Sequence, residues 1–404
     1  PKAALMREDW GRTFTRATSE ADYVPPAPSD EEGLSEVQTE AILNMRLRYE
    51  NVDQDGLAET ASALTLRTRF GFEAPRRNGF SVLLEGENTT HLIDDFADTI
   101  TPNPGYPVVA DPEVTELNRA QISWRGETGA GVTLGRQWFV LGDQRFAGPV
   151  GFRQNSQSVD AIRITSGDTW PVTLDYTYID RVHRIFGGDH PLGELDSASH
   201  AGEARVDTPL GEVAAFALLL DFDNAPALSS QTLGLRLTGT HEAIAYRFEL
   251  ANQSDYGAST GDFDLTYLRA EADYRSGNLS VGGGVEVLGG DGVQGFQTPL
   301  ATLHKFQGAA DVFLSTPADG LRDLYVRGSW RFPDAAPGPV SLSLAWHDFA
   351  SDDGDIDYGS EIDFVAGLAL TERLSAEAKA VVFDGDAGGP ADRTKIWLSL
   401  VFDY

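Results

Sequence analysis

Arginine is the side chain through which this sequence could do chemistry, because it recurs on one face of alternating segments. Arg46 and Arg48 share a face of one segment, and Arg67 and Arg69 share a face of the next. Guanidinium groups bind carboxylates through a planar fork and keep their charge at any relevant pH. A row of arginines therefore favours a surface that passes or binds anions, and pairing with neighbouring carboxylates is the structural alternative.

Later segments continue both the arginine row and its acidic counterpart. Further arginines on the same face are Arg119, Arg125, Arg163, Arg181, Arg236, Arg247, Arg327 and Arg331. Acidic residues on that face are Glu50, Glu73, Glu85, Asp175, Glu249, Asp323 and Glu377. Opposed charges across a lumen produce a transverse field, so the row alone does not establish anion selectivity.

The rest of the composition excludes several other chemistries. The chain has no cysteine, which removes disulfides, thiolate metal sites and a cysteine nucleophile. Its seven histidines stand mostly in loops or at strand ends, and no GxSxG or HExxH motif occurs. The acidic stretches 53–56 and 352–357 do not complete a twelve-residue calcium loop. We therefore expect no enzyme activity, no catalytic residue, no metal site and no cofactor.

Period-two alternation dominates the chain and predicts the elements that position the arginines. Segments of ten or more residues alternate apolar and polar side chains between Gly, Pro, Asp and Asn punctuation. Soluble strands usually run about five or six residues, whereas these lengths suit strands that cross a bilayer at a tilt. The longest apolar run, 213–220, is far shorter than the roughly 18 residues of a helical span.

The closing stretch "KIWLSLVFDY", residues 395–404, is typical of a lipid-facing strand. Its apolar stripe consists of Ile396, Leu398, Leu400, Phe402 and Tyr404. A terminal aromatic residue suits the interfacial girdle of a membrane barrel. The stretch resembles the C-terminal signal that the barrel assembly machinery recognises in outer-membrane barrels, so we expect that machinery as a partner.

The spacing of the links sets the number of strands. Short links alternate with longer, more acidic ones, as in outer-membrane barrels with short periplasmic turns and longer external loops. Nineteen segments qualify as strands, but 305–316 breaks the alternation, and treating 289–320 as one loop leaves eighteen. We expect an all-β transmembrane antiparallel barrel over 37–404, in contact with lipid and lipopolysaccharide in a Gram-negative outer membrane. Residues 1–36, Pro-rich and acidic, are expected to form a short periplasmic segment or plug.

The stretch "LGRQWFVLGDQRFAGPVGFRQNSQSVDAIRI", residues 134–164, holds the most distinctive loop. A strand ends near Arg136, and a Gly-punctuated loop dense in Arg and Gln returns at residue 159. We expect this loop to fold inward and narrow the pore with its polar side chains. Those side chains are Asp143, Gln144, Arg145, Arg153 and Gln154.

In this stretch the chain resembles the alginate export family of Gram-negative outer-membrane porins. The resemblance extends to residues 118–124, 295–326, 347–363 and the closing strand. It implies an eighteen-stranded barrel whose lumenal arginines contact a polyuronate. By motif, Arg119 and Arg136 match best, and the arginine pairs at 46/48 and 67/69 match more loosely. The net charge of -31 departs from what suits a polyanion, so the resemblance supports a porin more than alginate transport.

The sequence thus predicts an outer-membrane porin for passive diffusion of small hydrophilic solutes, with anionic solutes, saccharides and acidic oligosaccharides as candidates. Alginate or polyuronate export is the alternative within transport. An adhesin or scaffold barrel with a blocked lumen is the alternative from another class. The acidic chain argues against nucleic acid as a partner, because phosphates would be repelled.

Overall fold

The computed structural model describes residues 39–167 and 169–404, whose wall is a single sheet of eighteen antiparallel strands. The strands are β1 Glu40–Gln54, β2 Ala61–Glu73, β3 Phe80–Asp95, β4 Val114–Arg125, β5 Gly131–Gln137, β6 Ser158–Thr165, β7 Val172–His183, β8 Glu194–Thr208, β9 Gly211–Leu220, β10 Ser230–His241, β11 Ile244–Ser254, β12 Asp264–Ser276, β13 Leu279–Leu288, β14 Leu321–Phe332, β15 Val340–Ala350, β16 Asp357–Ala369, β17 Leu374–Gly385 and β18 Arg393–Asp403. Two short 3-10 turns, η2 Pro226–Leu228 and η3 Leu303–Lys305, lie in loops. None of the helical segments in these ranges is long and apolar enough to span a membrane.

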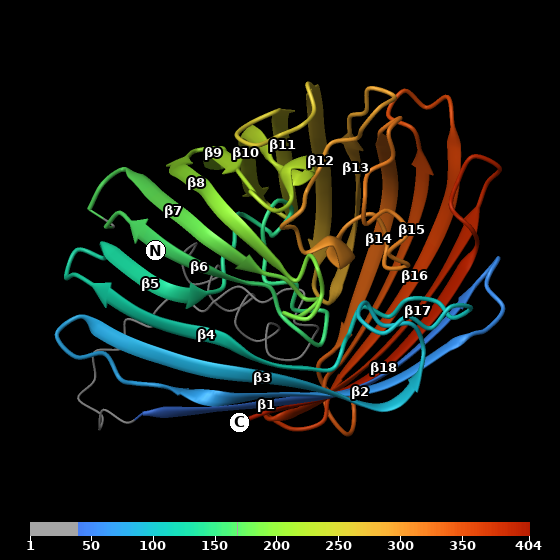
Figure 1. Ribbon diagram of the computed structural model, residues 1–404, viewed down its shortest axis with the longest axis horizontal. Coiled ribbons are helices and arrows are strands. Elements are labelled where there is room, and N and C mark those ends of the chain that lie inside the picture. Colours follow the sequence, from blue (N-terminus) through green and yellow to red (C-terminus); the bar gives the residue numbers. More distant parts are fainter. Residues whose placement is uncertain (1–38, 168) are drawn as a thin grey trace.

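The sheet closes on itself, since β1 pairs with both β2 and β18 (Figure 1). Leu47 is in register with Leu66 on one side and with Leu400 on the other. A closed sheet has no free edge, so each strand finds its hydrogen-bond partners in two neighbours. The expected eighteen-stranded barrel is confirmed, with 289–320 as a loop. The expected N-terminal segment, residues 1–36, lies outside the described residues.

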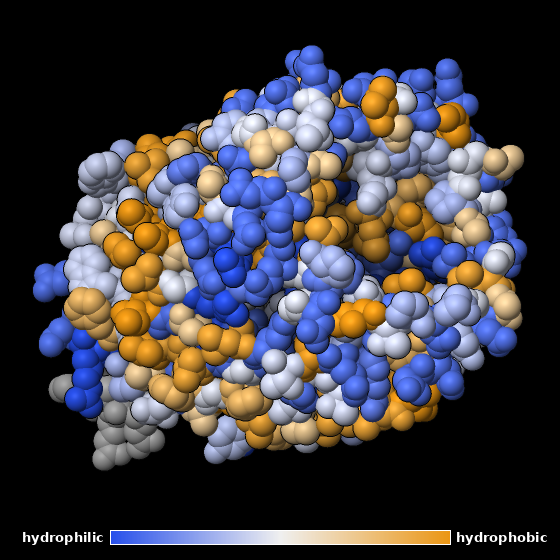
Figure 2. Space-filling model, viewed as in Figure 1, coloured by the Kyte–Doolittle hydropathy of each residue, from blue (hydrophilic) through white to orange (hydrophobic). Residues whose placement is uncertain are grey.

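Alternation sorts the side chains of each strand between an apolar outer face and an inner face. On β18, Leu398 is 53% exposed on the outside, whereas Trp397 is 1% exposed on the inside. On β14, Leu324, Val326 and Trp330 are likewise exposed, in agreement with the face expected from the sequence. Figure 2 shows apolar side chains gathered on the left flank of the wall, over the strands β3 to β6 of Figure 1.

Short and long links alternate around much of the barrel, as the sequence predicted, although the links 55–60 and 74–79, and likewise 333–339 and 351–356, are similar in length. Residues 209–210, 242–243 and 277–278 are tight turns at one end. The longest links, 138–157 and 289–320, leave the other end and lie inside the wall (Figure 1). We call these two loops together the inner plug.

The inner plug forms a hydrophobic core with the loop-side half of the inner wall. Phe146 packs on Phe216 of β9 and Tyr267 of β12, with ring centroids 5.0 and 5.2 Å apart. Phe313 packs on Phe349 of β15, with centroids 4.8 Å apart. Because buried aromatic surface stabilises a fold strongly, these contacts hold both loops against the wall.

Candidate functional site

The two loops of the inner plug bind each other through backbone and amide groups. The backbone N–H of Gly148 donates to the carbonyl of Leu300 over 2.9 Å, and that of Thr302 donates to the carbonyl of Gln144 over 3.1 Å. The side-chain amide of Gln157 also donates to Leu300 over 2.9 Å. Polar groups of irregular backbone inside a barrel need such partners, so the plug forms one hydrogen-bonded body.

Arg46 and Arg48 of β1 hold this body to the wall. Arg46 donates to the carbonyl of Gly151 over 3.0 Å and to that of Arg153 over 2.5 Å. Arg48 donates to the carbonyl of Phe152 over 2.5 Å. The several donors of a guanidinium satisfy carbonyls that lack a β partner, so both arginines act here as anchors of the plug.

Loop 96–113 adds a buried carboxylate to the same anchor. Asp111, fully buried, accepts from the backbone N–H of Gln154 over 2.7 Å and pairs with Arg48. Burial alone would raise the pKa of this carboxyl, but Arg48 and Arg153 outweigh burial and hold the pKa below its ordinary value. Asp111 therefore stays charged and ties a third loop to the plug.

Arg67 and Arg69 of β2 are also buried in paired contacts. Arg67 donates to Asn44, and Arg69 pairs with Glu87 of β3 and donates to Ser156 of the plug. Each of these arginines is 5% exposed or less. The structure thus places the arginines of β1 and β2 inside the barrel, as expected, but not on an open surface.

The polar residues of loop 138–157 do lie inside the barrel, and each is engaged by a partner. The contacts are Asp143 with Arg269 (2.8 Å), Gln144 with Thr302 (2.7 Å), Arg145 with Glu286 (2.5 Å), Arg153 with Asp311 (2.8 Å) and Gln154 with Thr65 (2.7 Å). Gln144, Arg145, Arg153 and Gln154 are all at most 6% exposed. The loop folds inward as predicted, but these side chains build the plug and do not border open space.

A buried ionic cluster, Asp311 with His304, Lys379, Lys395 and Arg153, fixes the second loop to the wall. Asp311 lies 2.8 Å from Nδ1 of His304 and 3.2 Å from Nζ of Lys395 on β18. Nε2 of His304 lies 2.8 Å from Nζ of Lys379 on β17. An ammonium can only donate, so Nε2 accepts and Nδ1–H donates to Asp311. His304 is therefore neutral, and burial lowers its pKa to about 3.

Arg119 and Arg163 face the lumen and are paired with acids on the neighbouring strand, and the guanidinium of Arg119 also lies 4.1 Å from the ring centroid of Trp138 in the plug. Arg119 bonds Glu85 over 2.7 Å, and Arg163 bonds both carboxylate oxygens of Asp175. Their side chains are 15% and 30% exposed. Both positions agree with the predicted lumenal face, and both charges are offset locally.

Arg136 lies on the outer face of the barrel, contrary to the expected lumenal position. Arg136 is in register with Asp160 and is bonded to it. The preceding residue, Gly135, is in register with Ala161, which is buried on the inner face. Leu134, two residues earlier, is 55% exposed on the outside. Two residues are one period of a strand, so Arg136 shares the outer face.

Arg181 is also on the outer face, for a different reason. A bulge between Ile179 and Arg181 shifts the alternation of β7 by one residue. Arg181 then pairs with Glu194 and Asp196 on the exposed side of β8. The expectation that it lines the lumen is wrong, because the bulge reverses the faces beyond Ile179.

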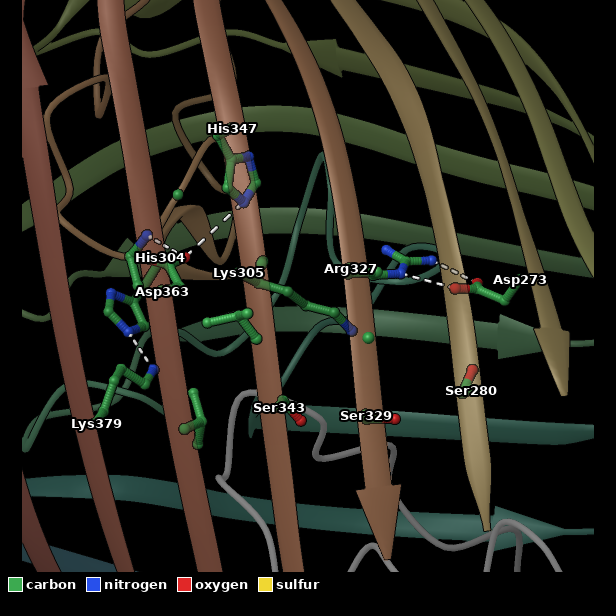
Figure 3. A pocket seen from close by; sticks show the side chains of 16 residues that line it. Asp273, Ser280, His304, Lys305, Arg327, Ser329, Ser343, His347, Asp363 and Lys379 are labelled. Atoms are coloured by element: carbon green, nitrogen blue, oxygen red, sulfur yellow. Dashed lines mark hydrogen bonds and ion pairs between the residues drawn. The ribbon is translucent and has the colours of Figure 1, made fainter. Parts of the chain in front are cut away.

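Arg327, another predicted site residue, lines a cavity. A cavity of about 340 Å³ lies between residues 304–309 of the plug and the inner faces of β12 to β17. Arg327 lines it, with its side chain 37% exposed and bonded to both oxygens of Asp273 over 2.9 and 2.5 Å (Figure 3). The polar residues around the cavity are Asp273, Ser280, His304, Lys305, Arg327, Ser329, Ser343, His347, Asp363 and Lys379.

Sequence reasoning missed Lys305 and His347 as cavity residues. Lys305 belongs to the segment that breaks the alternation, and lysine is rare in this arginine-rich chain. His347 faces inward from β15 and contacts Asp323 over 2.9 Å. The signal for Lys305 was the broken alternation itself, which marks a loop where polar side chains are displayed by irregular backbone.

Within residues 39–167 and 169–404, no group of three or more His, Asp or Glu side chains is placed to hold a metal ion. The cavity is lined by cationic, carboxylate and hydroxyl groups. Such groups can donate hydrogen bonds to a small polar solute and accept them from it.

Comparison with known proteins gives matches in structure alone. No family model matches the sequence, and no curated protein matches it. Among solved structures, OccK9 (OpdG) of Pseudomonas aeruginosa matches with a TM-score of 0.69 at 14% identity, over 91% of this chain and 98% of that one. OccAB4 of Acinetobacter baumannii matches with a TM-score of 0.68 at 14% identity, over 91% and 98% of the two chains.

A third match is a structure with a small molecule, vanillate. The structure of OpdK of Pseudomonas aeruginosa with vanillate matches with a TM-score of 0.66 at 13% identity, over 90% of this chain and 99% of that one. OpdK is described as an outer membrane protein. At these identities the likeness establishes that the chain shares the eighteen-stranded fold of these proteins.

Proposed function

We propose that this protein is a passive channel of a Gram-negative outer membrane for small hydrophilic solutes, including anionic ones. The observation that carries the proposal is a polar cavity inside a closed barrel whose outer face is apolar. The polar interior suits water and polar solutes, and the apolar outer face suits contact with lipid. The two faces together therefore suit a pore across a bilayer.

The outer surface supports insertion into lipid. Leu235, Leu250 and Leu344 are each 55–57% exposed on the outer face, where water would solvate them poorly. An exposed apolar band of this kind is costly in water and favourable in hydrocarbon. The proposed partners are therefore the bilayer and lipopolysaccharide, with the barrel assembly machinery acting on the closing strand during biogenesis.

The orientation follows from the links. Short turns of barrels of this type face the periplasm and long loops face outward. We therefore assign the turns at 209–210 and 242–243 to the periplasm. The end of the barrel from which the inner plug descends is then the outer mouth.

A small organic acid or saccharide fits the lumen better than a polymer. The cavity of about 340 Å³ is near the lower end of the roughly 300–1,000 Å³ typical of small-molecule sites. Vanillate, which is present in the matched structure of OpdK, is a small aromatic carboxylate. Alginate export, the finer resemblance seen in the sequence, remains the second candidate, favoured by the Arg-rich inner wall but not by the narrow space beside the plug.

Purified protein in planar bilayers and in solute-loaded liposomes tests the proposal. We expect discrete single-channel currents, and swelling in monosaccharides that falls steeply for trisaccharides because the cavity is small. Heat-denatured protein is the control. Absence of both current and swelling would favour the scaffold barrel with a blocked lumen, and passage of alginate oligomers at monosaccharide rates would favour polyuronate export.

A further inference from the structure

The inner wall differs in side-chain size on its two sides. Where β13 to β15 border the cavity, four small side chains point inward beside Arg327 and His347, namely Ser280, Ser329, Ser343 and Ala345. On β1 and β2 the inward side chains include Arg46, Arg48 and Arg69, which are bonded to the plug. Since small side chains leave volume that arginines fill, open space lies along β12 to β17.

The charges around this space are also distinct. Three cations (Lys305, Arg327 and Lys379) and two carboxylates (Asp273 and Asp363) line the cavity, and Arg327 is bonded to Asp273. Lys379 is 8% exposed and turned to the neutral ring of His304, so it is set back from the open space. Lys305 and Arg327 are the more exposed cations, one on the plug and one on the wall. Figure 3 shows Lys305 extending from the plug in the direction of the Arg327 strand.

We infer that this cavity is the solute-selecting site of the channel, with Lys305 and Arg327 as the residues that contact the acid group of a small hydroxylated organic anion. The inference rests on the proposed channel function. The hydroxyls of Ser280, Ser329 and Ser343 donate to and accept from the hydroxyls of the solute. The buried arginines of β1 and β2 hold the plug and do not touch the solute.

The balance of charges explains why such a site passes its solute. Arg327 is held by both oxygens of Asp273, and its Nη1 lies 3.2 Å from Glu271. Its attraction for an anion is therefore partly offset, and Lys305 adds a second cation to the cavity wall from the side of the plug. Conduction needs binding strong enough to admit a solute and weak enough to release it.

Cysteine substitution tests the route directly, because the chain has no native cysteine. Ser329→Cys and Ser343→Cys place a thiol on the cavity wall, and Ser123→Cys places one on the inner face of β4, across the lumen. Each is treated with a sulfonate-bearing methanethiosulfonate, and the adduct is confirmed by mass spectrometry. We expect the adducts at 329 and 343 to lower single-channel conductance about twofold or more, because they narrow the path. The adduct at 123 should leave conductance near that of the unmodified variant.

Charge removal tests the selectivity with galacturonate and galactose as probes. We expect Lys305→Gln and Arg327→Gln each to weaken block of the current by galacturonate roughly three- to tenfold, with little effect on galactose. The matched control is Arg205→Gln on β8, whose side chain is 35% exposed and bonded to Glu203 over 3.1 Å, like Arg327 but away from the cavity. It should leave the block unchanged.

Each result decides one question. If the wild type carries no current, the channel function and this inference both fall. If it conducts but Ser123→Cys responds as strongly as Ser329→Cys, or Arg205→Gln as strongly as Arg327→Gln, the inference falls and the channel remains. Should Arg327→Gln fail to assemble, the cysteine adducts decide alone.

Discussion

Asp311→Asn should release the inner plug from the wall while leaving the barrel closed. Asp311 is 7% exposed and is the carboxylate shared by Arg153, Lys395 and His304 at 2.8, 3.2 and 2.8 Å. Asparagine can still accept from His304, but Lys395 loses the carboxylate it contacts, and Arg153 keeps only its longer contacts with Glu50 (3.6 Å) and Asp111 (3.9 Å). The strands themselves are held by backbone hydrogen bonds that this substitution does not touch.

The size of the effect follows from the burial of the cluster. Removing one partner of a buried, hydrogen-bonded charge pair costs about 3–5 kcal/mol. The three contacts share one carboxylate, so their separate values do not add. At about 1.4 kcal/mol per tenfold, the ratio of docked to undocked plug should fall roughly 10²- to 10³-fold or somewhat more.

Two measurements follow the plug in the Asp311→Asn variant. Single-channel records should show larger mean conductance and frequent transitions between levels, and protease should cut within 289–320 at sites protected in the wild type. Asp319→Asn, in the same loop but exposed, is the matched control. If Asp311→Asn matches the wild type in conductance, noise and proteolysis, the ionic cluster does not hold the plug, and its aromatic contacts suffice.

Other expectations concern pH, lipid contact, the outer arginine and orientation. When the plug is docked, His304 is neutral with its pKa near 3, whereas a free histidine has a pKa near 6.5. Docking of the plug should therefore weaken by about 1.4 kcal/mol per pH unit as the pH falls from 6.5 to 3, and the current noise should rise. Constant current noise over that pH range would contradict this expectation. Leu400→Arg, 40% exposed on the outer face in the wild type, should reduce assembly in liposomes, at a cost of up to about 2–4 kcal/mol near the midplane. Arg136→Ala should leave ion selectivity unchanged in reversal-potential measurements, since Arg136 faces outward; a shift would place it back in the lumen. Epitopes inserted at 354–359 should be labelled on intact cells and those at 334–339 should not, and the reverse would invert the barrel.

The faces of the strands could be read from the sequence because the period of a strand is two. That rule correctly separated Leu398 from Trp397 and placed Arg46 and Arg48 inside. Applied from Leu134, the same rule puts Arg136 outside, so its assignment to the lumen followed the loop motif rather than the period. Arg181 could not be placed in this way, because a bulge leaves no clear mark in the sequence.

Burial and pairing of the inner arginines could not be predicted, because their partners are distant in the sequence. Arg46 bonds Gln154, 108 residues away, and Arg153 bonds Asp311, 158 residues away. Alternation gives the face of Lys395 but not that it is 3% exposed against Asp311. Such contacts depend on how two loops fill one lumen, which is a property of packing rather than of local pattern.

A net charge of -31 does not by itself decide which ions the proposed channel selects. Acids in exposed loops are solvated, and salt screens them over about 8 Å at physiological ionic strength. Inside the barrel, Arg119 and Arg163 are each offset by a carboxylate on the next strand and contribute little net field. In the proposed channel, the charge that a solute meets at close range is then set by the few groups that line the cavity, among them Lys305 and the Arg327–Asp273 pair. Neither the total charge of the chain nor the number of its arginines should therefore fix the ion selectivity. We expect the selectivity to depend on the charged groups that remain exposed in the lumen once the plug is docked.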